Sequence, residues 1–170
     1  MATSAEVLLD GYERVREVVH EAVDGLDAAA LNFRVDPGAN SIAWLVWHLT
    51  RVQDDHIADV AGLEQVWTAH GWFDRFALPI DPRATGYGDS ADDVALIQAP
   101  AELLTGYYDE VHEHTLRYVR ELTDADLSRV VDTHWNPPVT LGVRLVSVIS
   151  DDLQHAGQAA YLRGVIARTS

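Results

Sequence analysis

Four long stretches of the sequence place apolar residues three or four positions apart, which is the spacing of one face of an α-helix. The expected helices cover approximately residues 4–25, 42–61, 101–122 and 140–168. A chain of 170 residues is long enough to bury one sizeable apolar core. The pattern therefore predicts an all-α protein whose residues 1–170 form a single domain of packed helices.

Helix-capping residues support two of these starts and one further short helix. Asn40 or Ser41 can cap the second helix, which should end at Gly62, and Thr140 can cap the fourth. Between helices two and three lies a long connection, about residues 63–99, rich in tryptophan and phenylalanine and then in proline and glycine. Within it Ser90 and Asp93 resemble a capping box that opens a short helix. We expect this connection to wrap one end of the bundle.

Composition excludes several classes of function. The net charge of −15 argues against nucleic-acid binding, which needs clustered basic residues. Cysteine is absent, so the chain carries neither a thiol nucleophile nor a thiolate metal site. No apolar run is long enough to span a membrane, and the N-terminus lacks the pattern of a signal peptide. We expect a cytoplasmic protein that binds neither membranes nor nucleic acid.

The fourth helix carries two side chains that can bind a metal. Asp151 and His155 lie four residues apart on the same side as Val148, Ala159 and Leu162, which should face the core. Burying an unpaired carboxylate is costly, and a divalent cation bound by both residues would compensate it. The alternatives are a simple surface ion pair between the two, or a role for the neighbouring Asp152 in place of Asp151.

A third candidate ligand lies on the second helix, where His48 shares a face with Leu45, Val52 and Asp55. A lone histidine on an apolar face is more often a core residue, but together with Asp151 and His155 it completes a set of three ligands. Three protein ligands leave a coordination position open, as catalytic metal sites require. The remaining histidines (His20, His56, His70, His112, His114 and His134) are weaker candidates, with His114 nearest to a core position.

Four other residues are candidates for binding a substrate or orienting a ligand. Arg51 and Arg144 lie near the metal-binding positions in the sequence and could receive a substrate carboxylate, although surface salt bridges would also explain them. Trp135 lies just before the fourth helix and could contact a substrate. Asp55 could orient a metal ligand by hydrogen bonding, or be an ordinary surface charge.

With these residues identified, the chain resembles the DinB/YfiT-like superfamily, and in particular its mycothiol-dependent branch. The resemblance rests on Asn40-Ser-Ile-Ala-Trp-Leu-Val-Trp-His-Leu49 and Asp151-Asp-Leu-Gln-His-Ala-Gly-Gln158, with Gly71-Trp-Phe-Asp-Arg-Phe-Ala-Leu-Pro79 and Gly86-Tyr-Gly88 between them. It implies an up-down-down-up four-helix bundle with a long connection between helices two and three, often assembled as a homodimer. Helices two and four should be adjacent.

The resemblance also implies a metal site and a chemistry. The family's metal ligands fall on His48, Asp151 and His155, with Asp151 where maleylpyruvate isomerase-type members have a glutamate. The implied metal is zinc, or alternatively nickel, manganese or iron, and the implied cosubstrate is mycothiol or a similar thiol. The expected function is metal-dependent transfer of this thiol to, or isomerisation of, a small electrophile. A metal-dependent hydrolase and a non-catalytic metal-binding module remain the alternatives.

Overall fold

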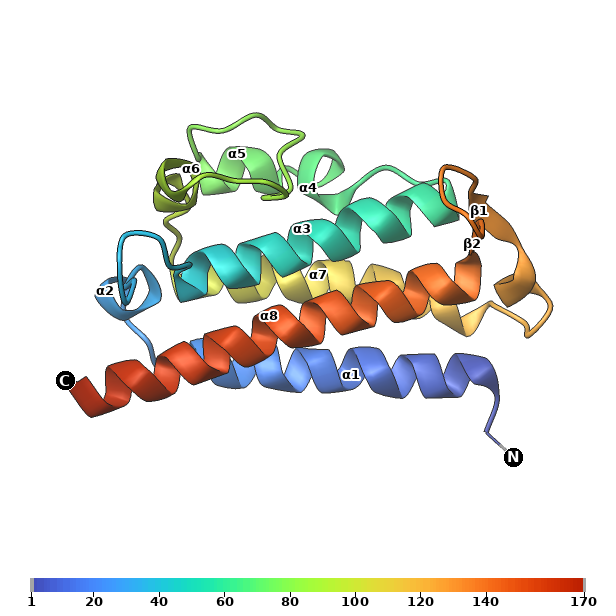
Figure 1. The fold of residues 1–170 in the computed structure, drawn as a ribbon, viewed down its shortest axis with the longest axis horizontal. Coiled ribbons are helices and arrows are strands. Elements are labelled where there is room, and N and C mark those ends of the chain that lie inside the picture. The colour runs from blue at the N-terminus through green and yellow to red at the C-terminus, as the bar shows by residue number, and fades with distance from the viewer. Residues whose placement is uncertain (1, 170) are drawn as a thin grey trace.

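The computed structural model describes residues 2–169 and is mostly helical, with four long helices packed side by side (Figure 1). These helices are α1 (Ser4–Val23), α3 (Ile42–Ala61), α7 (Ala101–Arg120) and α8 (Leu141–Thr169). Their directions follow the up-down-down-up order that the sequence predicts: α3 and α7 run one way, and α1 and α8 run the opposite way. The predicted fold class is confirmed.

Local signals in the sequence set the helix ends. The Ser41 side chain accepts a hydrogen bond from the backbone N–H of Trp44 and caps α3, which ends at Gly62 in a left-handed conformation with φ of 67°. The short helix α6 (Ala91–Leu96) begins with the predicted capping box, in which Ser90 and Asp93 bond reciprocally. Both boundaries agree with the sequence analysis.

Each long helix packs on two neighbours, so the four form a square in cross-section. Helix α3 contacts α7 and α8, and α1 contacts the same two helices from the other side. The predicted adjacency of helices two and four, here α3 and α8, is therefore confirmed. Their apolar faces meet in a core that includes Tyr12, Val15, Trp47, Leu104 and Tyr107, each at most 1% exposed.

We expected the connection between α3 and α7 to wrap one end of the bundle, and this prediction is wrong. It runs back along the side formed by α3 and α7 and contains α4 (Val66–Ala69), α5 (Trp72–Phe76) and α6 (Figure 1). The physical reason is that α3 and α7 are parallel, so the chain must return along a 20-residue helix, about 30 Å, before α7 can begin. Buried Trp67 and Trp72 fasten this segment to the bundle.

The other short elements lie at the two ends of the bundle. They are α2 (Ala28–Leu31), a 3-10 helix (Asp126–Ser128) and an antiparallel hairpin of β1 (Val130–Asp132) and β2 (Val139–Thr140). This hairpin is the single sheet among residues 2–169, and it leads directly into α8. None of the described helices is long and apolar enough to cross a membrane.

Candidate metal centre

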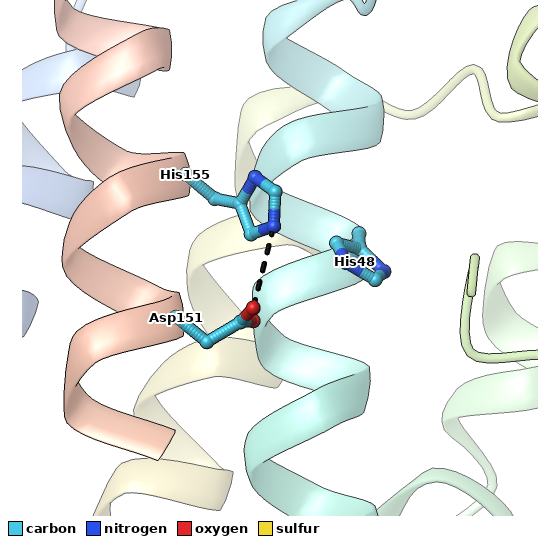
Figure 2. Close-up of side chains that lie close together, drawn as sticks. All are labelled: His48, Asp151 and His155. Carbon is cyan, nitrogen blue, oxygen red and sulfur yellow. Dashed lines mark ion pairs between the residues drawn. The ribbon is translucent and has the colours of Figure 1, made fainter. Parts of the chain in front are cut away.

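The packing of α3 against α8 brings the three predicted metal ligands together. His48 lies in the first half of α3, and Asp151 and His155 lie one turn apart on the facing side of α8 (Figure 2). One ligand atom from each residue lies within 4.8 Å of the other two. Asp151 Oδ1 and His155 Nε2 are 3.6 Å apart, and the two imidazole rings have centroids 4.7 Å apart.

The connection between α3 and α7 fixes the tautomer of His48. Its Nδ1 lies 2.5 Å from the backbone carbonyl oxygen of Thr85, which can only accept a hydrogen bond. Nδ1 therefore carries the proton, and the lone pair of Nε2 is left free for a metal. The Trp44 ring stacks on the imidazole with centroids 4.5 Å apart and restricts its rotation.

Gly86 allows the backbone to approach His48 this closely. Its φ of +88° is unfavourable for other residues, and a Cβ atom built there would lie 2.6 Å from His48 Nδ1 and 3.1 Å from Trp44 and Trp47. The Gly86-Tyr-Gly88 segment is therefore part of the site through its lack of a side chain, and His48 is oriented by a segment remote from it in the sequence.

Asp151 supplies the strongest indication that a cation belongs here. Its Oδ2 atom is buried and has no hydrogen-bond partner among the described residues. Burial alone raises the pKa of this carboxyl, but the interactions with His155 and then His48 outweigh burial and leave its pKa below the usual range. The group is therefore an ionised carboxylate with one unsatisfied oxygen, which a bound cation would compensate.

The two histidines differ in their proton affinity. Burial is the main cause of the lowered pKa of His48, so this residue is neutral at neutral pH. The interaction with Asp151 is the main cause of the raised pKa of His155. Nδ1 of His155 lies 3.3 Å from Oε1 of Gln158, a contact that leaves Nε2 facing Asp151. Two imidazoles and one carboxylate are ligands that suit zinc and other first-row divalent ions.

Asp152, the alternative carboxylate, points elsewhere. It is fully buried on the side of α8 near Tyr12 and Tyr108, whose pKa values are raised first by burial and then by its charge. Burial, and then the charge of Asp151, raise the pKa of Asp152 well above its usual range. The geometry therefore groups Asp151, and not Asp152, with the two histidines.

A cavity of about 580 Å³ opens beside His48 and Asp151. Arg144 lies in its wall, 16% exposed, and its two terminal nitrogens contact His56 Nδ1 at 2.7 Å and Asp132 Oδ2 at 3.0 Å. Two aromatic side chains, Trp135 and Tyr87, also line it and are 67% and 92% exposed. The remaining lining residues are Val52, Asp55, Thr85, Val139, Ser147 and Val148.

The structure thus places Arg144, Trp135 and Asp55 around the cavity but not Arg51. Arg51 is fully buried, where it donates to the Ala84 carbonyl at 3.0 Å and to Gln65 Oε1 at 2.9 Å. Its predicted role in receiving a substrate does not fit this position, because its guanidinium holds the α3–α7 connection in place. Asp55 accepts a hydrogen bond from Gln65 at 2.6 Å, whereas the partner of His48 is Thr85.

Sequence reasoning missed several contributors to this site. His56 and Asp132 line the cavity, and Thr85 and Gly86 orient His48. His56 lies two turns beyond His48 on α3, a spacing that gives a weak signal for one shared side. Nothing near Thr85 in the sequence indicates that its carbonyl meets α3. His112, one of the weaker candidates in the sequence, is 3% exposed and stacks on Tyr108, so it is closer to the core than the sequence suggested.

Comparison with known proteins agrees with this architecture. The family model described as Mycothiol-S-transferase matches residues 7–168. Among solved structures, the crystal structure of a conserved protein from Enterococcus faecalis is similar, with a TM-score of 0.90 and 29% sequence identity. The similarity covers 96% of this chain and 96% of that one. No curated protein matches the chain.

Proposed function

The chain belongs to the mycothiol-S-transferase family, and from this premise we propose that it transfers a mycothiol-type thiol to a small electrophile in a reaction that depends on a divalent metal. His48, Asp151 and His155 would hold the metal, zinc being the first choice. The observation that carries the proposal is the buried, unpaired Oδ2 of Asp151 between two histidines at the wall of a cavity.

When bound, a divalent ion would favour the thiolate over the thiol, which is otherwise mostly protonated at neutral pH because its pKa is about 8.5. The chain's own contribution is to fix the ligand atoms beforehand. Thr85 and Trp44 orient His48 so that Nε2 is free, and His155 keeps the Asp151 carboxylate ionised. The chain has no cysteine, so the sulfur nucleophile must come from the cosubstrate.

The cavity wall suggests how the substrates are held. Arg144 is the cationic side chain of the wall, and its pairing with Asp132 fixes its direction while leaving further N–H donors for a ligand. Trp135 and Tyr87 present exposed rings that can cover a bound molecule. We assign Arg144 and Trp135 to substrate contact, either with the thiol or with the electrophile. Isomerisation through a reversible thiol adduct would use the same groups.

Calorimetric titration of mycothiol into zinc-loaded and metal-free protein tests the proposal. We expect affinity at least tenfold higher in the loaded protein, and His155→Ala should behave as the metal-free protein does. His20→Ala is a matched control, because His20 pairs with Asp109 at 2.7 Å on the surface and is not one of the three proposed ligands. Equal affinity in loaded and metal-free wild type would contradict the proposal.

Cobalt substitution distinguishes thiol transfer from hydrolysis. Addition of mycothiol to cobalt-loaded protein should produce intense sulfur-to-cobalt charge-transfer bands, which water and hydroxide do not give. A rate assay with monochlorobimane, whose thiol adduct is fluorescent, should show turnover only with both metal and thiol present. Turnover that needs the metal but not the thiol would favour a hydrolase, and no response in either experiment would favour a non-catalytic module.

A further inference from the structure

A second group of metal-competent side chains lies away from the cavity, between α7 and the connection that precedes it. His70 follows α4, and Glu110 and His114 lie on α7. One ligand atom from each residue lies within 4.8 Å of the other two. We propose that His70, Glu110 and His114 form a second binding site for a divalent cation of the zinc type, independent of the first.

The second cluster is built on the same spacing as the first. Glu110 and His114 are four residues apart and share one side of α7, as Asp151 and His155 do on α8. The third ligand again comes from a separate segment: His70 Nδ1 is 2.5 Å from Glu110 Oε1, and the His70 and His114 rings have centroids 5.2 Å apart. A carboxylate and two imidazoles from two segments therefore converge on one point.

The carboxylate of Glu110 is oriented before any ion arrives. The indole N–H of Trp72 donates to its Oε2 atom at 2.6 Å, which leaves Oε1 directed at His70. Trp72 itself is only 3% exposed and is held between the Arg75 guanidinium, 3.5 Å from its ring, and the core residue Tyr107. Such a hydrogen-bonded partner behind a ligand is a usual feature of metal sites in proteins.

The position of the cluster indicates what a bound ion would do. The side chains of His70 and Glu110 are 41% and 34% exposed, so an ion could enter from solvent and keep water ligands. No residue of this cluster lines the cavity beside His48. An ion here would join the α4–α5 segment to α7 and would stabilise the folded chain by binding it in preference to the unfolded one.

A nearby histidine–carboxylate pair lacks the third ligand that the second cluster has. His20 on α1 contacts Asp109 of α7 at 2.7 Å, with comparable exposure of about 37% for both side chains. Arg16 shares the same carboxylate, and no third ligand completes a set among the described residues. His20→Ala therefore removes a similar surface contact without removing a metal ligand, and it serves as a matched control.

Zinc binding to untagged protein, measured by equilibrium dialysis with metal analysis, tests the proposal. We expect two ions per chain for wild type and His20→Ala, one for His114→Ala, one for His155→Ala, and none for the double variant His114→Ala/His155→Ala. The single ion retained by His155→Ala should raise its Tm by several degrees, and this rise should vanish in the double variant.

Two outcomes would overturn the second site: one ion in wild type and none in His155→Ala, or two ions in His114→Ala. If His114→Ala loses helical content, Glu110→Gln replaces it, since glutamine keeps the size and can still accept from Trp72 but lacks the carboxylate charge. That variant should also bind one ion, and two ions would contradict the proposal.

Discussion

The two clusters contain the same kinds of ligands at the same helical spacing, yet their surroundings differ. In the inner cluster, His48, Asp151 and His155, one carboxylate oxygen is buried without a partner and a cavity of about 580 Å³ adjoins it. In the outer cluster, His70, Glu110 and His114, both oxygens of Glu110 are already hydrogen-bonded. In the inner cluster a bound cation would therefore compensate the unpaired carboxylate oxygen, and the adjoining cavity has room for substrates.

This difference separates the roles that we propose for the two clusters. Where a carboxylate is left unsatisfied beside a cavity, a bound ion can act on a ligand in that cavity. Where both carboxylate oxygens already have hydrogen-bond partners, an ion adds a cross-link between two segments and contributes to stability. The i, i+4 spacing alone does not distinguish the two, and the following predictions test the distinction in order of expected effect.

The largest effect should come from removing one imidazole of the inner cluster. His155→Ala should weaken zinc binding at that cluster by at least about a hundredfold. Even substitution of a residue that only hydrogen-bonds to a metal ligand lowers metal affinity by about ten- to a hundredfold. Helical content measured by circular dichroism should remain nearly unchanged, since His155 is not part of the buried core. Equal zinc affinities of wild type and variant, measured by competition with a chromophoric chelator, would refute the assignment.

A buried carboxyl, Asp152, directly follows Asp151 of the inner cluster on α8. Asp152 keeps its proton in the folded chain at pH values where the unfolded chain, with the ordinary pKa of 3.8, has released it. The stability associated with this group is therefore fully present below pH 3.8 and is lost as pH rises toward the folded-state pKa. Asp152→Asn should stabilise the metal-free protein by about 2 kcal/mol at pH 7.

Urea unfolding of metal-free wild type and Asp152→Asn at neutral and acidic pH measures this effect. The difference in free energy of unfolding should shrink as pH falls and approach zero well below pH 3.8, where Asp152 is neutral in the folded and in the unfolded chain. Asp10→Asn is the control, because Asp10 is an exposed partner of Arg14 and should matter little at either pH. A variant less stable than wild type at pH 7 would show that Asp152 has a stabilising partner in its ionised form.

A smaller effect should follow from crowding His48. Gly86→Ala places a Cβ atom 2.6 Å from His48 Nδ1 and should disturb the hydrogen bond to Thr85, weakening zinc binding at the inner cluster by about twentyfold. Gly88→Ala is a matched control, because Gly88 has a similar φ of +80° but no atom within 4 Å of its Cβ position. Equal losses in both variants would mean that backbone strain, and not the contact with His48, is responsible.

The smallest effect should come from the residue behind the outer cluster. Trp72→Phe removes the N–H that orients Glu110 while keeping an aromatic ring in the core, so zinc binding at the outer cluster should weaken by about tenfold. The measurement belongs in the His155→Ala background, where only the outer cluster binds. An unchanged affinity would show that Glu110 needs no such orientation, and the inner cluster of the otherwise wild-type chain should be unaffected.

Much of the fold was predictable because it depends on local patterns. The three- and four-residue spacing of apolar side chains located all four long helices, and Ser41, Gly62 and the Ser90–Asp93 box set boundaries through bonds within one turn. The predicted path of residues 63–99 was wrong. The true path follows from the parallel directions of α3 and α7, which no local pattern encodes. The burial of Arg51 follows from the same path, since that connection covers it.

The sequence by itself determined which side chains could bind a metal: two positions four residues apart on α8 must lie on one side of that helix, and His48 must share a side of α3 with Val52 and Asp55. Only the tertiary structure decided that Asp151 rather than Asp152 meets the histidines, since neighbouring residues on a helix point about 100° apart and the packing partners choose between them. It also brought the Thr85 carbonyl to His48 and His70 to Glu110 and His114. These contacts join residues far apart in the chain, and they form only when the connection folds back along α3 and α7.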